Sequence, residues 1–310
     1  PFILKKTVVR DHPIKHIVIL GFGGVGNHLM LFPAIQFIRR EMPEVHLHVV
    51  AASTPCAELL KEGCKVDSVS VCNLSAPRKW SKYISILNHL KILNPDVIIG
   101  AAGLDPVFIS ILSFQSGASF RIGANWRGRG FLFTHDINLD GLEYEAFQNL
   151  KLAARLFDIS FQELPHEPQL LLNEALLMEG GKWKLSLNLN QKGILVGIHP
   201  GSGHTQKWKR WELKRFVDLA QLLKTKCSCD YVFFLGPDEM DLREALLNFN
   251  VSARLIVSND RSILQAASCI AQCQLFIAND SGLRQVAVSL GVPSIGIFGP
   301  TSTEKNFLGN

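Results

Sequence analysis

The fold is decided by residues 16–26, which read HIVILGFGGVG and join a short apolar run to a glycine-rich turn. A run of this length that ends in glycine predicts a buried strand of a parallel sheet. Apolar residues then recur at helical spacing from Leu29 to Met42, Pro43 ends that helix, and the next strand is expected at 45–51. Strand, glycine turn, helix and strand in this order predict the start of a Rossmann-like α/β domain.

Short apolar segments alternate with helical ones along the rest of the 310 residues. At roughly 150 residues for each domain, this length predicts about two domains. Prolines and a Gly-Gly pair gather in residues 161–190, and we expect a linker with a small helix at 166–190. We therefore predict an α/β fold with an amino-terminal Rossmann-like domain at 1–165 and a carboxyl-terminal one at 191–310.

Composition and charge exclude several classes of protein. Hydrophobic residues make up 47% and charged residues 19% of the chain, a mixture that builds cores rather than disordered segments. The net charge of +5 is far too small to indicate nucleic acid as a partner, although it suits phosphates or an acidic lipid surface. No apolar run is long enough to span a membrane, and no secretory signal is recognisable. Seven cysteines without zinc-ligand spacing indicate a reducing cytoplasm and predict no metal site.

The glycine turn has more than one interpretation. Residues 21–26 contain the spacing GxGxxG, which binds NAD in a Rossmann fold when an acidic residue ends the second strand. Here that strand ends Val50-Ala51-Ala52-Ser53, without an acid, so an NAD-dependent oxidoreductase is only an alternative. The glycines are better explained as letting a helix start approach a ligand closely. A tight turn that binds nothing is the remaining interpretation.

The carboxyl-terminal half carries two further turns of small residues after predicted strands. His199-Pro-Gly-Ser-Gly203 is followed by Lys207, Lys209 and Arg210, and Asn279-Asp-Ser-Gly282 begins a predicted helix. Backbone amides at such turns bind phosphate groups, and a nearby cation strengthens the site, so we predict that a pyrophosphate binds here. A solvated basic loop is the alternative for the first turn, and helix capping alone would explain Asp280.

Taken together in order and spacing, six carboxyl-terminal motifs resemble the ADP-heptose:lipopolysaccharide heptosyltransferases, glycosyltransferase family 9. They lie at residues 199–203, 209–211, 236–239, 279–282, 290–293 and 298–301. Two amino-terminal motifs, at 23–26 and 121–123, are also similar, and the resemblance extends over residues 17–301. It implies the GT-B fold, in which two Rossmann-like domains flank a cleft and the second domain holds most of the donor. The family usually continues beyond the last motif, so we expect this sequence to be a fragment.

The resemblance also implies a reaction and its partners. The implied enzyme is an inverting glycosyltransferase that needs neither a metal nor a cofactor. It would move heptose, or a related sugar, from a nucleotide diphosphate sugar such as ADP-heptose to a lipopolysaccharide core or another anionic glycolipid or glycan. A lipid acceptor implies a cytoplasmic enzyme in peripheral contact with the inner membrane.

Seven residues are implied to bind the donor: Ser202, Gly203, Lys209, Glu239, Asp280, Ser281 and Gly282. Ser202 and Gly203 would line the diphosphate, and Lys209 would neutralise it or contact the ribose. Glu239 would bind the ribose hydroxyls, and the turn at 280–282 would close around the phosphates and the sugar.

Two positions depart from the family pattern, and both bear on the base that removes the acceptor's proton. The resemblance implies an Asp where this chain has Asn27, and often a His where it has Gln285. His28, which titrates near neutrality, and Asp105, after a predicted strand, are therefore candidate catalytic residues beside Asn27 and Lys209. An incidental histidine beside a turn is the simpler interpretation of His28.

Candidate acceptor-binding residues are Gly24 in the glycine turn and the basic residues Arg121 and Arg127, which lie near Trp126. They would suit a phosphorylated or acidic sugar, although ordinary surface charge would give the same pattern. Three hypotheses follow: a family 9 transferase, a relative that binds nucleotide sugars without turnover, and an NAD-dependent oxidoreductase. The second is motivated by Asn27 and Gln285.

Overall fold

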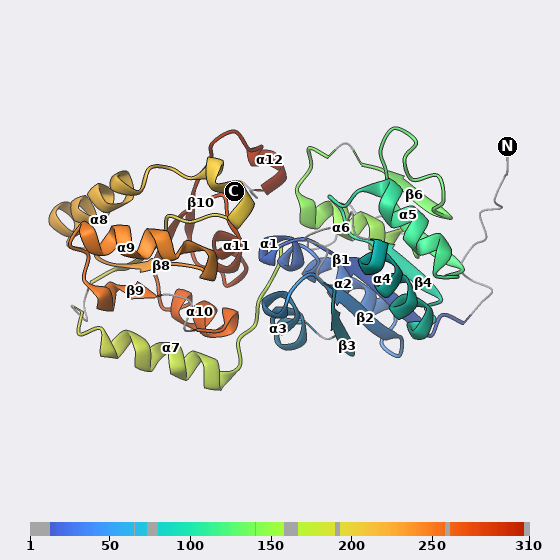
Figure 1. Ribbon diagram of the computed structural model, residues 1–310. Coiled ribbons are helices and arrows are strands. Elements are labelled where there is room, and N and C mark those ends of the chain that lie inside the picture. Colours follow the sequence, from blue (N-terminus) through green and yellow to red (C-terminus); the bar gives the residue numbers. More distant parts are fainter. Residues whose placement is uncertain are drawn as a thin grey trace. The chain divides into compact units, whose positions relative to one another are not determined.

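The computed structural model describes residues 13–64, 66–72, 80–139, 141–157, 167–189, 193–257 and 261–306. The described residues separate into two compact units, with the division between Pro168 and Gln169. Each unit is built on one parallel sheet with helices on both of its faces (Figure 1). This is the α/β architecture predicted from the sequence.

The first unit contains a six-stranded sheet in the order β3-β2-β1-β4-β5-β6, with every neighbouring pair parallel. Its strands are β1 (His16–Gly21), β2 (His46–Ala51), β3 (Ser68–Val71), β4 (Val97–Gly100), β5 (Phe120–Asn125) and β6 (His135–Asn138). The strands β2 and β3 lie on one side of β1 in the sheet, and β4 lies on its other side. Residues 17–20 of β1 are at most 1% exposed, and burying each such side chain contributes roughly 1.5–3 kcal/mol.

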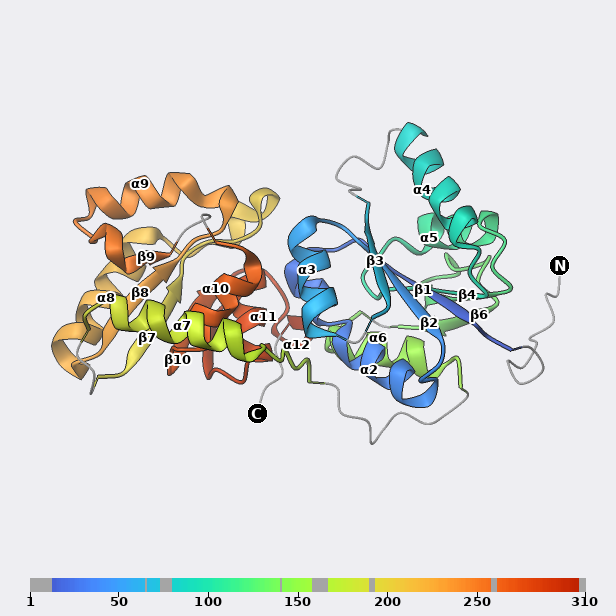
Figure 2. The same cartoon turned by 90° about the horizontal axis from the view of Figure 1, so that it is seen from below.

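The helices described in this unit are α1 (Val25–Leu29), α2 (Phe32–Glu41), α3 (Thr54–Gly63), α4 (Trp80–Leu93), α5 (Pro106–Gln115) and α6 (Glu145–Ala154). The helices α4 and α5 cover one face of the sheet, where Leu90 and Leu112 join the core formed with Val18. The helices α2 and α6 pack together on the other face (Figures 1 and 2). The helix expected from Leu29 to Met42 is α2, which begins at Phe32 because Pro33 lies in its first turn, where the missing N–H suits a helix start. The short helix α1 precedes it and begins within the segment expected as a glycine turn.

The second unit contains a five-stranded parallel sheet in the order β11-β10-β7-β8-β9. Its strands are β7 (Leu195–His199), β8 (Asp230–Phe234), β9 (Ile256–Val257), β10 (Leu275–Asn279) and β11 (Ser294–Ile297). The central strand β7 has all five residues buried, as expected for a parallel strand with helices on both sides.

The helices described here are α7 (Glu174–Ser186), α8 (Leu213–Cys227), α9 (Met240–Asn248), α10 (Ile263–Ile270), α11 (Gly282–Ser289) and α12 (Thr303–Asn306), with short 3₁₀ turns η2 (His204–Lys209), η3 (Pro237–Glu239) and η4 (Ala253–Leu255). Phe216 of α8 and Leu246 of α9 pack on one face of the sheet. On the other, α7 lies along α10 (Figure 2). Their approach is close, since a Cβ on Gly180 would lie 2.2 Å from the carbonyl oxygen of Ser268. The segment expected as a linker therefore supplies a helix to the outer layer of this unit.

Candidate active site

In the second unit the chain reverses its direction across the sheet between β7 and β10. The strands β8 and β9 follow β7 on one side, whereas β10 lies on the other. The loops that leave β7 and β10 therefore diverge at the carboxyl edge of two neighbouring strands. Open α/β sheets bind their ligands at this topological switch point. The two loops carry six of the seven residues predicted to bind the donor, and Glu239 follows β8.

Asn279, the last residue of β10, ties these loops together. Its side chain is fully buried, and Nδ2 donates to the carbonyl oxygens of Pro200 at 2.8 Å and Gly201 at 3.3 Å. Its Oδ1 accepts from the backbone amide of Trp211 at 3.0 Å. Both ends of the loop after β7 are thus fastened to the end of β10, as a satisfied buried amide can do. Sequence reasoning found no separate role for Asn279, because its partners lie 68 to 79 residues away in the chain.

Lys209 and Asp280 meet across the switch point. The Nζ of Lys209 lies 2.9 Å from Oδ2 of Asp280, and the two side chains are 12% and 7% exposed. The same ammonium lies 5.8 Å from the centre of the Trp208 indole ring, whose side chain is largely exposed. A partly buried cation at the carboxyl edge of two strands is suited to an anionic ligand. The structure therefore brings together two of the residues predicted from separate motifs.

The serines of the two loops act as local anchors. Ser202 Oγ donates to the carbonyl oxygen of Gln206 at 3.0 Å and accepts from Arg210 Nε at 3.1 Å. Ser281 caps α11, with its Oγ accepting from the amide of Arg284 at 3.4 Å. Gly282 is the first residue of that helix, so its amide belongs to the positive end of the helix dipole. These positions are compatible with the predicted phosphate site.

Glu239 has a different environment from the one the sequence suggested. Its side chain is buried, and Oε2 accepts from the amide of Gly236 at 2.7 Å, while Oε1 lies 3.6 Å from Arg210. The carboxylate also fills the space above Gly201, where an added Cβ would lie 1.7 Å from Oε1. In this structure Glu239 joins the loop after β8 to the loop after β7. That geometry supports a positioning role and does not by itself support a contact with ribose.

The first unit has a corresponding switch point between β1 and β4. Asn149 of α6 joins the segments that follow these strands, since Oδ1 accepts from the amide of Ala102 at 2.8 Å and Nδ2 donates to the carbonyl oxygen of Met30 at 3.1 Å. The glycine turn after β1 closes on itself, because Asn27 Oδ1 accepts from the amide of Gly24, the N-cap of α1, at 3.1 Å. Asn27 is exposed, and its Nδ2 donates to Oε1 of Glu145 at 2.7 Å.

His28 and Asp105, the two predicted candidates for the base, are both engaged. His28 is 0% exposed, and its Nδ1 donates to the carbonyl oxygen of Gly24 at 2.9 Å. Burial lowers the pKa of His28 below its usual value, which favours the neutral ring. Asp105 is the N-cap of α5, where its Oδ1 accepts from the amides of Val107 at 2.9 Å and Phe108 at 3.1 Å. Capping of α5 explains Asp105 without a catalytic role.

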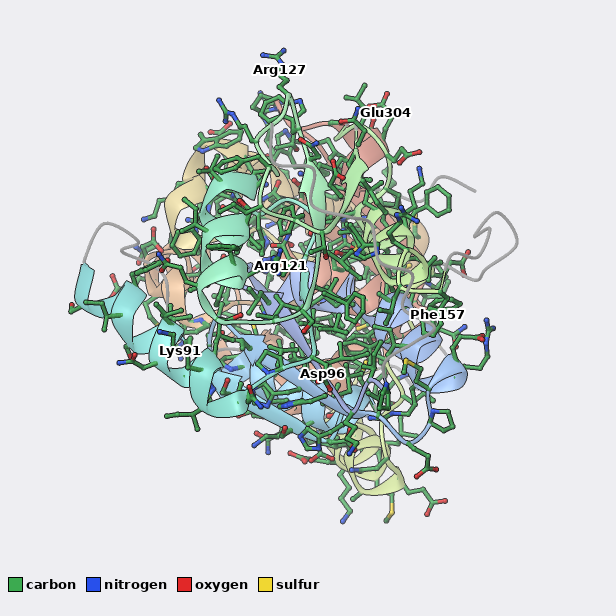
Figure 3. The ribbon with its side chains drawn as sticks, turned by 90° about the vertical axis from the view of Figure 1, so that its right-hand side faces the viewer. Lys91, Asp96, Arg121, Arg127, Phe157 and Glu304 are labelled. Carbon is green, nitrogen blue, oxygen red and sulfur yellow. The ribbon has the colours of Figure 1, made fainter. Side chains whose placement is uncertain are left out.

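The two arginines predicted to bind the acceptor differ sharply. Arg121 is 8% exposed and donates from Nε and Nη1 to the carbonyl oxygens of Leu132 and Ala118, at 2.9 and 2.7 Å. Its role is to fasten the loop before β6, so the structure does not support the prediction that it binds the acceptor. Arg127 is exposed and projects outward at the tip of the loop after β5 (Figure 3). Its guanidinium lies 5.1 Å from the Trp126 ring centre.

A surface hollow of about 460 Å³ lies at the carboxyl ends of β5 and β6. It is lined by Asn125, Trp126, Arg127, Gly128, Asn138 and Leu139. Among the described residues, no three His, Cys, Asp or Glu side chains are grouped so that they could hold a metal ion. No helix in the described part of the chain is both long and apolar enough to cross a membrane.

Two parallel α/β sheets, one in each compact unit, are the architecture of the GT-B fold. The chain belongs to glycosyltransferase family 9, the heptosyltransferase family, whose family model matches residues 90–306. The family expected from the sequence motifs is thereby confirmed, as is the class of enzyme.

Curated relatives and solved structures agree with this assignment. The chain is 28% identical over 310 aligned positions to lipooligosaccharide heptosyltransferase 2 of Haemophilus influenzae, covering 93% of this chain and 84% of the relative. It is 26% identical over 205 residues to lipopolysaccharide heptosyltransferase 2 of Escherichia coli, covering 63% of this chain and 58% of the relative.

Two solved structures share the fold. A family 9 glycosyltransferase from Veillonella parvula superimposes with a TM-score of 0.77 at 20% identity, over 94% of this chain and 82% of that one. The E. coli heptosyltransferase WaaC with ADP gives a TM-score of 0.70 at 18% identity, over 94% and 89%. At these identities the superpositions show the fold alone, and they agree with the predicted GT-B arrangement of two Rossmann-like sheets.

Proposed function

We propose that this chain transfers heptose, or a related sugar, from ADP-heptose or a similar nucleotide sugar to a hydroxyl group of a lipopolysaccharide-core type acceptor. The transfer proceeds with inversion at the anomeric carbon and without a metal ion. The observation that carries the proposal is the placement of Lys209 beside Asp280 and the start of α11, at the switch point of the second sheet. Family membership and the ADP bound to the related WaaC protein support the choice of nucleotide.

The donor site must stabilise a departing diphosphate. As the bond between the anomeric carbon and phosphate oxygen breaks, negative charge develops on that oxygen, and a preorganised cation and backbone amides lower the barrier. Lys209 supplies the cation, and the starts of η2 and α11 supply the amides of Gly203, Ser281 and Gly282. Asp280 holds the Lys209 ammonium in place before the donor binds.

The acceptor contacts the hollow beside Trp126 and Arg127. An exposed indole offers a flat apolar face to a sugar ring, and Arg127 and Arg129 carry positive charge within 5.5 Å of the centre of that ring. This combination suits a sugar that bears phosphate or carboxylate groups. Because such acceptors are lipid-linked, we place the reaction in the cytoplasm, in peripheral contact with the inner membrane.

An assay of ADP release tests the proposed reaction. The purified chain is incubated with ADP-heptose and heptose-free core acceptors, and we expect ADP to appear only when both are present. Lys209→Ala should lower kcat/KM by about 10²–10³, the usual effect of removing a group that stabilises a developing oxyanion. Lys214→Ala is the matched control, because Lys214 also pairs with a carboxylate, at 2.7 Å, but is 59% exposed on α8. No ADP release with any nucleotide sugar, or full activity of Lys209→Ala, would contradict the proposal.

The rival hypothesis of binding without turnover keeps a specific observation in its favour, since Asn27 cannot accept a proton at neutral pH. Calorimetry separates the two: ADP binding without transfer to any acceptor tested would favour the rival. An NAD-dependent oxidoreductase predicts binding of NADH instead, which a fluorescence titration would detect. The strand β2 ends at Ala51 and is followed by Ala52 and Ser53, so the acidic partner for the ribose is missing there.

A further inference from the structure

The proposed transfer needs a group that takes the proton of the acceptor hydroxyl, and the following inference rests on that proposed function. Uncatalysed, a sugar hydroxyl is a poor nucleophile, and a positioned carboxylate or imidazole accelerates such a step by about 10²–10⁴. The acceptor hollow lies at the carboxyl edge of the sheet in the first unit. The base should therefore be found at this edge.

Most of the titratable groups here already serve the fold. Asp105 caps α5, and His28 donates from Nδ1 to the carbonyl oxygen of Gly24. Glu143 forms an ion pair with Lys151, with distances of 2.5 and 2.6 Å to its two oxygens. Asp136 accepts from Asn125 Nδ2. These contacts explain each of the four groups without catalysis.

Glu145 is placed differently. It is the first residue of α6, and its carboxylate is 3% exposed yet accepts a hydrogen bond of 2.7 Å from the side chain of an exposed residue, Asn27. The Asn27 amide also accepts from the amide of Gly24, so one side chain links the carboxylate to the glycine turn after β1. Burying a carboxylate is costly unless specific contacts hold it, and the hydrogen bond from Asn27 is one such contact.

The environment of this carboxylate suits its negative form. A carboxylate in the first turn of a helix is stabilised by the positive end of the helix dipole. The Nδ2–H of Asn27 adds a hydrogen bond to the charge, and charge-assisted bonds of this kind are strong. Close packing of the turn on Asn27 keeps the donor aimed, since a Cβ on Gly23 would lie 2.5 Å from Cβ of Asn27. The carboxylate is thus held ionised. When a hydroxyl group displaces the Asn27 amide, one stabilising hydrogen bond to the charge is lost, and the carboxylate can take the proton of that hydroxyl group.

We propose that Glu145 is the catalytic base of the transfer and that Asn27 is its positioning residue. The acceptor oxygen forms a bond to the anomeric carbon of the donor, and the bond from that carbon to the diphosphate oxygen breaks. The diphosphate leaves with the electron pair. The proton of the acceptor hydroxyl passes to the carboxylate of Glu145, and solvent later removes it. The carboxylate expected at position 27 is thus supplied by a different element, α6.

Glu145→Gln tests the base directly, because the amide oxygen of Gln can still accept from Asn27. We expect kcat to fall by about 10²–10⁴. The Kd for ADP, measured by calorimetry, should stay unchanged, and the ascending acidic limb of the pH–kcat profile should disappear. Glu143→Gln is the matched control, two residues earlier and with the same chemical change, and should keep wild-type kcat and the same pH profile. A folded Glu145→Gln protein with wild-type kcat would overturn the assignment.

A swap of the two groups gives a second, independent test. The double variant Asn27→Asp with Glu145→Gln reverses the hydrogen bond, so that an amide on α6 now donates to a carboxylate on α1. We expect it to recover at least tenfold in kcat over Glu145→Gln alone, with the acidic limb restored at a shifted pH. No recovery in a folded double variant, or loss of kcat in Asp105→Asn instead of Glu145→Gln, would overturn the inference. Absence of turnover by the wild-type chain would reject the proposed function itself, together with this inference.

Discussion

Lys209 Nζ lies 2.9 Å from Asp280 Oδ2, and this ion pair joins loops that are 71 residues apart in the chain. Both side chains are mostly buried, at 12% and 7% exposed, so neither charge is fully solvated. For a partly buried pair, removal of one partner leaves the other uncompensated, which costs more than the pair itself contributes. A donor diphosphate therefore meets a cation that is already oriented and already partly neutralised.

Variants of Lys209 and Asp280 should differ in their affinity for ADP. We expect Lys209→Ala and Asp280→Asn each to lower the free energy of unfolding by roughly 1–3 kcal/mol, measured by urea denaturation. In a titration with ADP, Lys209→Ala should bind at least tenfold more weakly. Asp280→Asn should bind ADP as well as the wild type or better, because the Lys209 ammonium is no longer shared. Equal weakening in both variants would mean that Asp280, rather than the cation alone, contacts the nucleotide.

Replacing Arg121 should affect stability, whereas replacing Arg127 should affect acceptor binding. Arg121→Ala leaves the carbonyl oxygens of Leu132 and Ala118 without their donor, so we expect a loss of roughly 2–3 kcal/mol in unfolding free energy. Arg127→Ala removes an exposed side chain and should change stability by less than about 0.5 kcal/mol. It should instead raise the KM for an anionic acceptor roughly tenfold, with the KM for the nucleotide sugar unchanged. If Arg127→Ala leaves the acceptor KM unaltered, the hollow beside Trp126 is not the acceptor site.

The central strands and long helices could be predicted from the sequence because their apolar residues follow one period. The strand expected at 45–51 is β2, at His46–Ala51, and the helix expected at 29–42 contains α2, at Phe32–Glu41. The edge strands of the first sheet could not be predicted. The strand β6 reads HDIN and β3 reads SVSV, so neither contains an apolar run, and each exists because it pairs with a neighbour already in the sheet.

The candidate site could likewise be predicted only in part. Motifs place Lys209 and Asp280 in the segments that follow two strands, but their contact depends on β10 lying beside β7, which is a matter of topology. The contact between Asn27 and Glu145 spans 118 residues and joins two helices through side chains. No local pattern records it, since Glu145 reads as an ordinary acidic residue in the first turn of a helix. The structural role of Arg121 could not be predicted either, because its partners are backbone carbonyl oxygens, which every residue has.

A cluster of histidines makes the first unit sensitive to acid. His48 is 4% exposed, with its two ring nitrogens 2.7 and 2.9 Å from the hydroxyls of Ser68 and Ser70, and rings of His16 and His89 lie within 6.4 Å. Burial, reinforced by repulsion from His89, His16 and His46, lowers the pKa of His48 to about 4. The unfolded chain takes up this proton near pH 6.5, so protonation favours unfolding between pH 6.5 and 4.

The stability supplied by a neutral His48 is therefore complete above pH 6.5 and lost as the pH falls towards 4. Between pH 7 and 5 we expect the free energy of unfolding to decrease by about 2 kcal/mol from this residue alone. Urea denaturation at the two pH values measures the change. His48→Gln keeps a hydrogen-bonding side chain without a titrating group, and should reduce the pH dependence by about half or more. An unchanged dependence in His48→Gln would assign the acid sensitivity to other groups, such as His16, whose pKa burial also lowers.

Gly201 and Glu239 should show strong coupling, because the carboxylate occupies the place where a side chain at position 201 would begin. A Cβ there would lie 1.7 Å from Oε1 and 2.0 Å from Cδ of Glu239, so Gly201→Ala forces the acid out of its contacts with Gly236 and Arg210. We expect Gly201→Ala to lower the free energy of unfolding by roughly 1–3 kcal/mol, the usual cost of overpacking. Gly203→Ala is the matched control. Among the described side chains its Cβ would come within 4 Å only of Gln206 Oε1, at 3.7 Å, so the change should cost less than about 0.5 kcal/mol.

Glu239→Ala removes the obstacle and so reveals whether the clash is the cause. In the double variant, the cost of Gly201→Ala should shrink by at least about 1 kcal/mol relative to its cost in the wild type, a coupling expected of residues in direct contact. Additive costs in this cycle would show that Gly201 is required for another reason, such as the hydrogen bond from Asn279 to its carbonyl oxygen. Binding of ADP by Glu239→Ala, compared with Glu239→Gln, then reports on the acid itself: if Glu239 only positions the loop after β7, Gln should retain the affinity that Ala loses.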